Sequence, residues 1–151
     1  MESIILRQIG TISRSLDSIS NVEFSQFDLA KGQYLYLVRI MENPGIIQHR
    51  LAQLLCVDKT TANRAINKLE KKGLVFKKET RKNKKEQLLY VTPEGAALYP
   101  LIIRENEFST QVALEGITTE ERQQLVVLLS KMAENTSKDW LAVKSGKQRN
   151  Y

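Results

Sequence analysis

Seven polar or positively charged side chains follow one another at short intervals in the middle of the chain. They are Lys59, Thr60, Thr61, Asn63, Arg64, Asn67 and Lys68. The apolar residues between them recur at helical spacing, so these seven are expected to share the outward face of a helix. Amides, hydroxyls and guanidinium groups hydrogen-bond to base edges and phosphates, and the major groove of DNA admits such a helix. The segment therefore predicts a recognition helix.

A shorter helix is predicted immediately before the recognition helix, and the two together occupy residues 48–75. Their apolar positions at helical spacing are Leu51, Ala52, Leu54 and Leu55, then Ala62, Ala65, Ile66 and Leu69. Asp58 precedes the second run, where its carboxylate can accept the free amides of the first turn. Gly73 follows that run and is expected to end the helix, because glycine adopts the closing backbone conformation at least cost. The pattern predicts a helix-turn-helix.

A basic hairpin is predicted directly after these two helices. Residues 74–79 and 87–92 are rich in strand formers and flank a polar loop. Four cations are expected at its tip: Arg81, Lys82, Lys84 and Lys85. Because like charges repel one another, a tip beside a recognition helix is expected to contact phosphates or a narrow minor groove. The alternative is a solvated loop.

The positive charge of the chain is concentrated in this region. Residues 58–86 carry eleven Lys and Arg against four Asp and Glu, whereas the other 122 residues carry twelve against thirteen. All of the net charge of +6 is therefore explained by one fifth of the chain. A surface of this kind is expected to face a polyanion, although a solvated Lys-rich face is the simpler alternative.

Apolar stripes occur on both sides of the basic region. Residues 2–20 carry Ile5, Ile9, Ile12, Leu16 and Ile19 at spacings of three and four. Such a narrow stripe is typical of a helix that packs against another helix. It either lies on the core of its own domain or takes part in a dimer interface, and we favour the dimer interface.

The expected fold is mainly α (α+β), a winged helix-turn-helix between an N-terminal helix and C-terminal helices. Further helices are predicted at residues 31–42, at 93–115 after a cap at Thr92, and after a capping box of Thr118 and Glu121. The predicted organisation has four parts: an N-terminal helix and connector at 1–30, a DNA-binding domain at 31–92, C-terminal helices at 93–143, and a loose basic tail at 144–151.

Composition excludes several other classes of protein. No run approaches the roughly 18 apolar residues of a membrane helix, and no signal peptide is recognisable at the start, so a cytoplasmic location is expected. One cysteine and one histidine support neither a disulfide framework nor a zinc site. No cluster of nucleophile, acid and base is present, so we expect neither an enzyme nor a cofactor. A winged helix that binds a protein instead of DNA is the alternative.

The chain resembles the MarR-type winged helix-turn-helix regulators. The residues that carry this resemblance are Gln33, Tyr34, Leu37, Pro44, Gly45, Gln48, Leu51, Ala52, Leu55, Val57, Asp58, Lys59, Thr61, Arg64, Ile66, Lys68, Leu69, Glu70, Lys72, Gly73, Leu74, Val75, Val91, Thr92 and Gly95. The resemblance implies a homodimer whose dimerisation helices lie at 1–30 and 93–143. It further implies that this dimer binds a pseudo-palindromic double-stranded DNA operator, commonly as a repressor. It also implies release by a small phenolic or lipophilic effector, or by cysteine oxidation.

The resemblance assigns roles to individual residues. The candidates for base edges are Thr60, Thr61, Asn63 and Arg64. The candidates for phosphates are Gln48, Lys59, Asn67, Lys68 and the four cations of the hairpin tip. The aromatic residues near the ligand site of the family are Phe24, Phe27, Tyr34 and Tyr36, which are otherwise expected in the core. Arg64 has an alternative role in a surface ion pair with Glu70 or another acidic residue.

Three features depart from the family pattern or leave two interpretations open. The tip carries Asn83, Lys84 and Lys85 where relatives carry Asp-x-Arg, and lysine lacks the planar fork of arginine. Ala30 and Ile47 stand where relatives place helix-capping Ser or Thr, at a cost of about 1 kcal/mol each. Cys56, in the turn between the two helices, is either an oxidant sensor or a buried small residue, and we favour burial.

Overall fold

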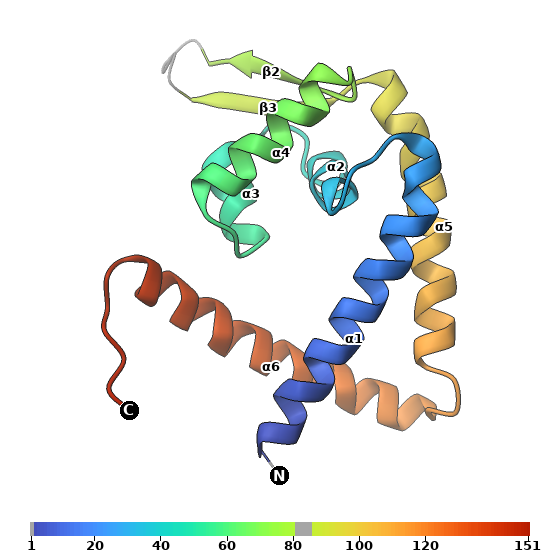
Figure 1. Ribbon diagram of the computed structural model, residues 1–151, viewed down its shortest axis with the longest axis vertical. Coiled ribbons are helices and arrows are strands. Elements are labelled where there is room, and N and C mark those ends of the chain that lie inside the picture. Colours follow the sequence, from blue (N-terminus) through green and yellow to red (C-terminus); the bar gives the residue numbers. More distant parts are fainter. Residues whose placement is uncertain (1, 81–85) are drawn as a thin grey trace. The chain divides into compact units, whose positions relative to one another are not determined.

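The computed structural model describes residues 2–80 and 86–151 of the chain. Within these residues it contains six α-helices, one 3-10 helix and three strands (Figure 1). The chain divides into two compact units, Met1–Ser109 and Thr110–Tyr151. The first unit holds α1 (Glu2–Glu23), the 3-10 helix η1 (Phe24–Phe27) and most of α5 (Pro93–Ala113), and the second holds α6 (Thr119–Lys144). The predicted fold class is confirmed.

The winged part of the first unit is built from three helices and a small sheet. Its elements are α2 (Gln33–Glu42), β1 (Ile46–Ile47), α3 (Gln48–Leu54), α4 (Lys59–Lys71), β2 (Val75–Glu79) and β3 (Gln87–Val91). The antiparallel sheet has the order β1-β3-β2, and β2 pairs with β3 from Val75 opposite Val91 to Glu79 opposite Gln87. The predicted hairpin is therefore confirmed. Strand β1 was not predicted, because two residues are too few for an alternating pattern.

One apolar core holds the helices of the winged part against the sheet. Its largest fully buried side chains are Phe24, Leu37, Ile40, Leu51, Ile66, Leu69, Val75, Leu89 and Ile102. They come from η1, α2, α3, α4, β2, β3 and α5, so the helix pair, the hairpin and the start of α5 pack as one body. Burial of each such side chain stabilises the fold by about 1.5–3 kcal/mol.

The start of α2 differs from the expectation. We placed this helix at residues 31–42 with Ala30 at the cap position, which is wrong, because α2 begins at Gln33 and its N-cap is Gly32, with φ 74°. Glycine adopts this left-handed conformation without steric cost. The Gln33 side chain closes the turn, since its Oε1 accepts the Ala30 amide at 2.8 Å. Ile47 does occupy the N-cap position of α3, with no capping side chain.

Thr92 fastens the start of α5 to the end of α4. Its hydroxyl donates to the carbonyl of Gly73 at 2.6 Å and accepts the amide of Gly95 at 3.0 Å. The Thr92 amide donates to the carbonyl of Leu74, also at 3.0 Å. The predicted cap is confirmed. The same hydroxyl bonds to the backbone that follows α4 and to the first turn of α5.

Helices α1 and α6 expose much of their apolar surface. Ser20, near the end of α1, donates to Oε2 of Glu105 of α5 at 3.4 Å, and the two helices approach one another at this end of α1 (Figure 1). The predicted capping box of Thr118 and Glu121 starts α6 and is confirmed. Helix α6 has no buried residue. Within the described ranges, no helix has the length and apolar character needed to cross a membrane.

Candidate nucleic-acid interface

Helices α3 and α4 form the predicted pair with a tight turn between them. The turn is closed by backbone bonds from the amides of Leu55, Cys56 and Val57 to carbonyls in α3. Cys56 adopts a left-handed conformation with φ 52°, and its side chain is exposed. Burial of Cys56 was therefore the wrong interpretation, because apolar spacing does not reveal a turn residue whose side chain points outward.

Asp58 caps the recognition helix α4 through Thr61. Its Oδ1 accepts the backbone amide of Thr61 at 2.8 Å and its Oδ2 accepts the Thr61 hydroxyl at 2.7 Å. The hydrogen bond from the Thr61 side chain, followed by that from its backbone, lowers the pKa of Asp58 below its ordinary value of 3.8. The cap is as predicted. The Thr61 hydroxyl donates its hydrogen to the cap, so only its acceptor lone pairs remain for a base edge.

The outward face of α4 presents most of the predicted DNA-contacting residues. The exposed ones are Lys59, Thr60, Thr61, Asn63, Arg64 and Lys68, while Asn67 and Gln48 are half-buried. Gln48 lies at the start of α3, and its Nε2 donates to Oδ1 of Asn63 at 3.1 Å. The structure thus brings a predicted phosphate contact and a predicted base contact together across the turn.

The opposite end of the recognition helix is held by the β2–β3 hairpin, which we call the wing. Lys77 of β2 donates to Oδ1 of Asn67 at 2.6 Å and pairs with Oε2 of Glu70 at 3.0 Å. The alternative ion pair between Arg64 and Glu70 does not occur among the described contacts, in which Glu70 pairs with Lys77. Sequence reasoning missed Lys77, although the alternation of β2 places it on the same face as the buried Val75.

The wing itself is stiffened by an aromatic pair. The rings of Phe76 and Tyr90, opposite one another in the β2–β3 ladder, stack with centroids 5.5 Å apart. The predicted tip contacts lie outside the described residues: Arg81, Lys82, Lys84 and Lys85. Their role stays a prediction.

The aromatic residues near the predicted ligand site lie in the core. Phe24 packs against Tyr34 with ring centroids 4.9 Å apart and against Phe27 with centroids 6.5 Å apart. Burial raises the pKa of the Tyr34 phenol, as it does for Tyr36, where the charge of Asp58 adds to the effect. Three of the four aromatic residues therefore form one cluster, and Tyr36 lies nearer the cap of α4. A ligand at these residues stays a prediction.

Lowering the pH is expected to weaken the cap of α4. Because the folded pKa of Asp58 is depressed, its carboxylate contributes stability that is fully present above the unfolded pKa of 3.8 and is lost as pH falls through the folded pKa. Asp58→Asn keeps a capping oxygen that does not titrate in this range. Urea titrations should give a difference in unfolding free energy between wild type and D58N that is constant from about pH 5 to 7. Below about pH 4 the wild type should lose stability relative to D58N. A constant difference down to about pH 3 would contradict this role.

Two helices joined by a tight turn and followed by an antiparallel hairpin define a winged helix-turn-helix protein. The model of the MarR family matches residues 29–86. YybA from Bacillus subtilis, described as an uncharacterized HTH-type transcriptional regulator, is 54% identical over 147 residues, which cover 97% of this chain and 98% of that protein. The chain belongs to the MarR family of transcriptional regulators, and the predicted resemblance is confirmed.

Two solved structures support this assignment. A putative MarR family transcriptional regulator from Listeria monocytogenes, complexed with 26mer DNA, is 57% identical with a TM-score of 0.94, over 97% of each chain. A mutant MarR from E. coli, complexed with operator DNA, is 25% identical with a TM-score of 0.74, over 83% of this chain and 91% of that one. The relatives are regulators and not enzymes, as the absence of a catalytic constellation in the sequence led us to expect.

Proposed function

We propose that this regulator binds a pseudo-palindromic DNA operator as a homodimer and represses transcription. The observation that carries the proposal is the outward face of α4, which is polar and cationic and is held in place at both ends. Asp58 caps its first turn, and Lys77 connects its last turns to the wing. A rigid, exposed helix with hydrogen-bonding side chains matches the donor and acceptor pattern of the major groove.

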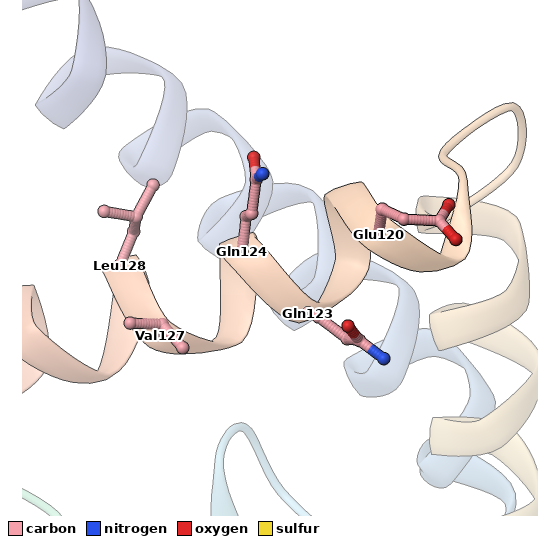
Figure 2. A pocket seen from close by; sticks show the side chains of 5 residues that line it. All are labelled: Glu120, Gln123, Gln124, Val127 and Leu128. Atoms are coloured by element: carbon pink, nitrogen blue, oxygen red, sulfur yellow. The ribbon is translucent and has the colours of Figure 1, made fainter.

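The homodimer is supported by apolar surface that a single copy leaves exposed. Ile12 of α1, Phe108 of α5 and Val126 of α6 are 55%, 66% and 65% exposed. Val127 and Leu128 border a hollow on α6 together with Glu120, Gln123 and Gln124 (Figure 2). An exposed apolar run such as residues 126–129 of α6 usually marks an interaction site. A second copy supplies the same helices, and a two-fold pair presents two recognition helices to the two half-sites of an operator.

Release of DNA by an effector completes the proposal. A lipophilic or phenolic molecule is proposed at the aromatic residues of η1 and α2, where Phe24, Phe27 and Tyr34 already pack against one another. The exposed thiol of Cys56 supports oxidation as a second route, because it lies in the turn that joins the two DNA-facing helices.

Selection from a pool of DNA duplexes of random sequence tests DNA binding without knowledge of the operator sequence. The wild-type protein is expected to enrich a pseudo-palindromic duplex. Fluorescence anisotropy at two salt concentrations should then show a steep loss of affinity with salt, because lysine and arginine contacts release counterions. Failure to enrich any duplex would refute DNA binding and favour a protein-binding winged helix.

Arg64→Ala is expected to weaken binding to the selected duplex by about 1–3 kcal/mol and to relax its sequence preference. The reason is that the exposed guanidinium of Arg64 can bond to both acceptors of a guanine. Arg64→Lys is the matched control, because lysine keeps the charge and loses the fork. Both variants should lose specificity in repeated selections. Wild-type specificity in R64K would reassign Arg64 to a phosphate.

A further inference from the structure

The contact between the wing and the recognition helix is made by a half-buried cation. Lys77 faces inward from β2, where it stands opposite Leu89 of β3, and its side chain is only 16% exposed. Its Nζ lies 2.6 Å from Oδ1 of Asn67 and 3.0 Å from Oε2 of Glu70, both on α4. Strand β2 runs beside this helix (Figure 1). One ammonium group therefore bridges the two elements that are proposed to contact DNA.

This bridge fixes which end of the Asn67 amide is bonded to Lys77. A lysine ammonium group has three donors and no acceptor, so it can bond only to the oxygen of an amide. With Oδ1 held by Lys77, the Nδ2 group is the part of Asn67 left for other partners. Asn67 is half-exposed, and it lies one helical turn beyond the exposed Asn63 and Arg64.

We propose that Lys77 is a positioning residue that turns Asn67 into an obligate hydrogen-bond donor toward DNA. The inference rests on the proposed function and names the chemistry of one contact, in which Nδ2 of Asn67 donates to an acceptor atom of the duplex. Phosphate oxygens and the O6 and N7 atoms of guanine are acceptors of this kind. Glu70 neutralises the half-buried Lys77 and keeps its ammonium group beside Asn67.

Asn67→Asp separates the orientation of the amide from the stability of the wing. A carboxylate at this position keeps an oxygen for Lys77, and the contact becomes an ion pair, so the protein should unfold at the same or a higher temperature. The same change replaces the outward donor by an acceptor. Affinity for the duplex selected by the wild-type protein is expected to fall about tenfold or more, because a hydrogen-bond donor is replaced by a carboxylate that the acceptor atom repels.

Substitutions of Lys77 test whether it acts through Asn67. Lys77→Met leaves the amide free to turn and is expected to lower affinity roughly tenfold. Lys77→Arg is expected to restore affinity, because a guanidinium group can donate to Asn67 and Glu70 together. Lys147→Met is the matched control for the lost charge, since Lys147 is exposed in the C-terminal tail, outside the helices proposed to contact DNA or a second copy. That control should bind DNA as the wild type does.

A double variant separates orientation from simple charge. Lys77→Met leaves Glu70 without its partner, so repulsion by Glu70 would also weaken binding. In Lys77→Met with Glu70→Gln this negative charge is gone, and affinity should remain about tenfold low if the amide orientation matters. Recovery of wild-type affinity in the double variant would overturn the inference, and so would wild-type affinity in N67D or K77M.

A second duplex of unrelated sequence identifies the acceptor. An equal loss of affinity by N67D for both duplexes assigns Nδ2 to a phosphate, whereas a loss for the selected duplex alone assigns it to a base edge. Either result supports the proposed donor role. Wild-type protein that selects no duplex refutes DNA binding itself, whereas DNA binding by the wild type with full affinity in K77M refutes only the role of Lys77.

Discussion

Gly95→Ala is expected to destabilise the protein by about 3 kcal/mol, at the upper end of the cost of overpacking a core. A Cβ on Gly95 would lie 2.1 Å from the carbonyl oxygen of Leu74 and 3.3 Å from Cδ1 of Leu37. The Leu74 carbonyl is backbone, and it already accepts the amide of Thr92 at 3.0 Å. Relief of the clash would therefore break the junction between the end of α4 and the start of α5. Elsewhere in a helix the same change usually stabilises by about 0.5–1 kcal/mol.

Gly10→Ala is the matched control for this prediction. Gly10 also lies within a helix, but its added Cβ would meet only the end of the flexible Arg14 side chain. Urea unfolding followed by circular dichroism should show a lower midpoint for G95A and no loss for G10A. Equal midpoints for G95A and the wild type would mean that the backbone of Leu74 does not approach Gly95 this closely.

The helix pair was predictable because its signals are local. An N-cap at Asp58, a stop at Gly73 and apolar spacing between them depend on neighbouring residues alone, and all three were confirmed. The same holds for the capping box at the start of α6. Local hydrogen bonds within one turn determine where such helices begin and end. Most of the elements of the fold follow from this kind of pattern.

The features that sequence reasoning missed depend on pairing between distant segments. Lys77 acts on Asn67 only because the register of β2 with β3 turns its side chain toward α4. The close approach of Gly95 to Leu74 depends on how α5 packs at the end of the hairpin. The outward turn of Cys56 depends on a left-handed backbone conformation, which spacing does not encode for a residue other than glycine.

The double variant Val127→Glu with Leu128→Glu, on α6, is expected to bind the selected duplex about a hundredfold or more weakly than the wild type does. Residues 125–129 form an unbroken apolar run, and Val126, Val127, Leu128 and Leu129 are 65%, 53%, 56% and 47% exposed. Five consecutive residues point around the whole helix, and a helix that is apolar on all sides is normally buried. We propose that a second copy of the chain buries this apolar run. Without it, each winged domain binds one half-site alone and the gain from linkage is lost.

Gln148→Glu with Asn150→Glu is the control, because it adds the same two charges to the exposed tail. Light scattering after size-exclusion chromatography should give a dimer for the wild type and the control and a monomer for the α6 variant. Circular dichroism should show that the monomer keeps its helices, since Val127 and Leu128 are not part of the buried core. A dimeric α6 variant with full DNA affinity would place the dimer interface elsewhere. A monomeric wild type that still selects a palindromic duplex would refute the homodimer, because the two half-sites would then be filled independently.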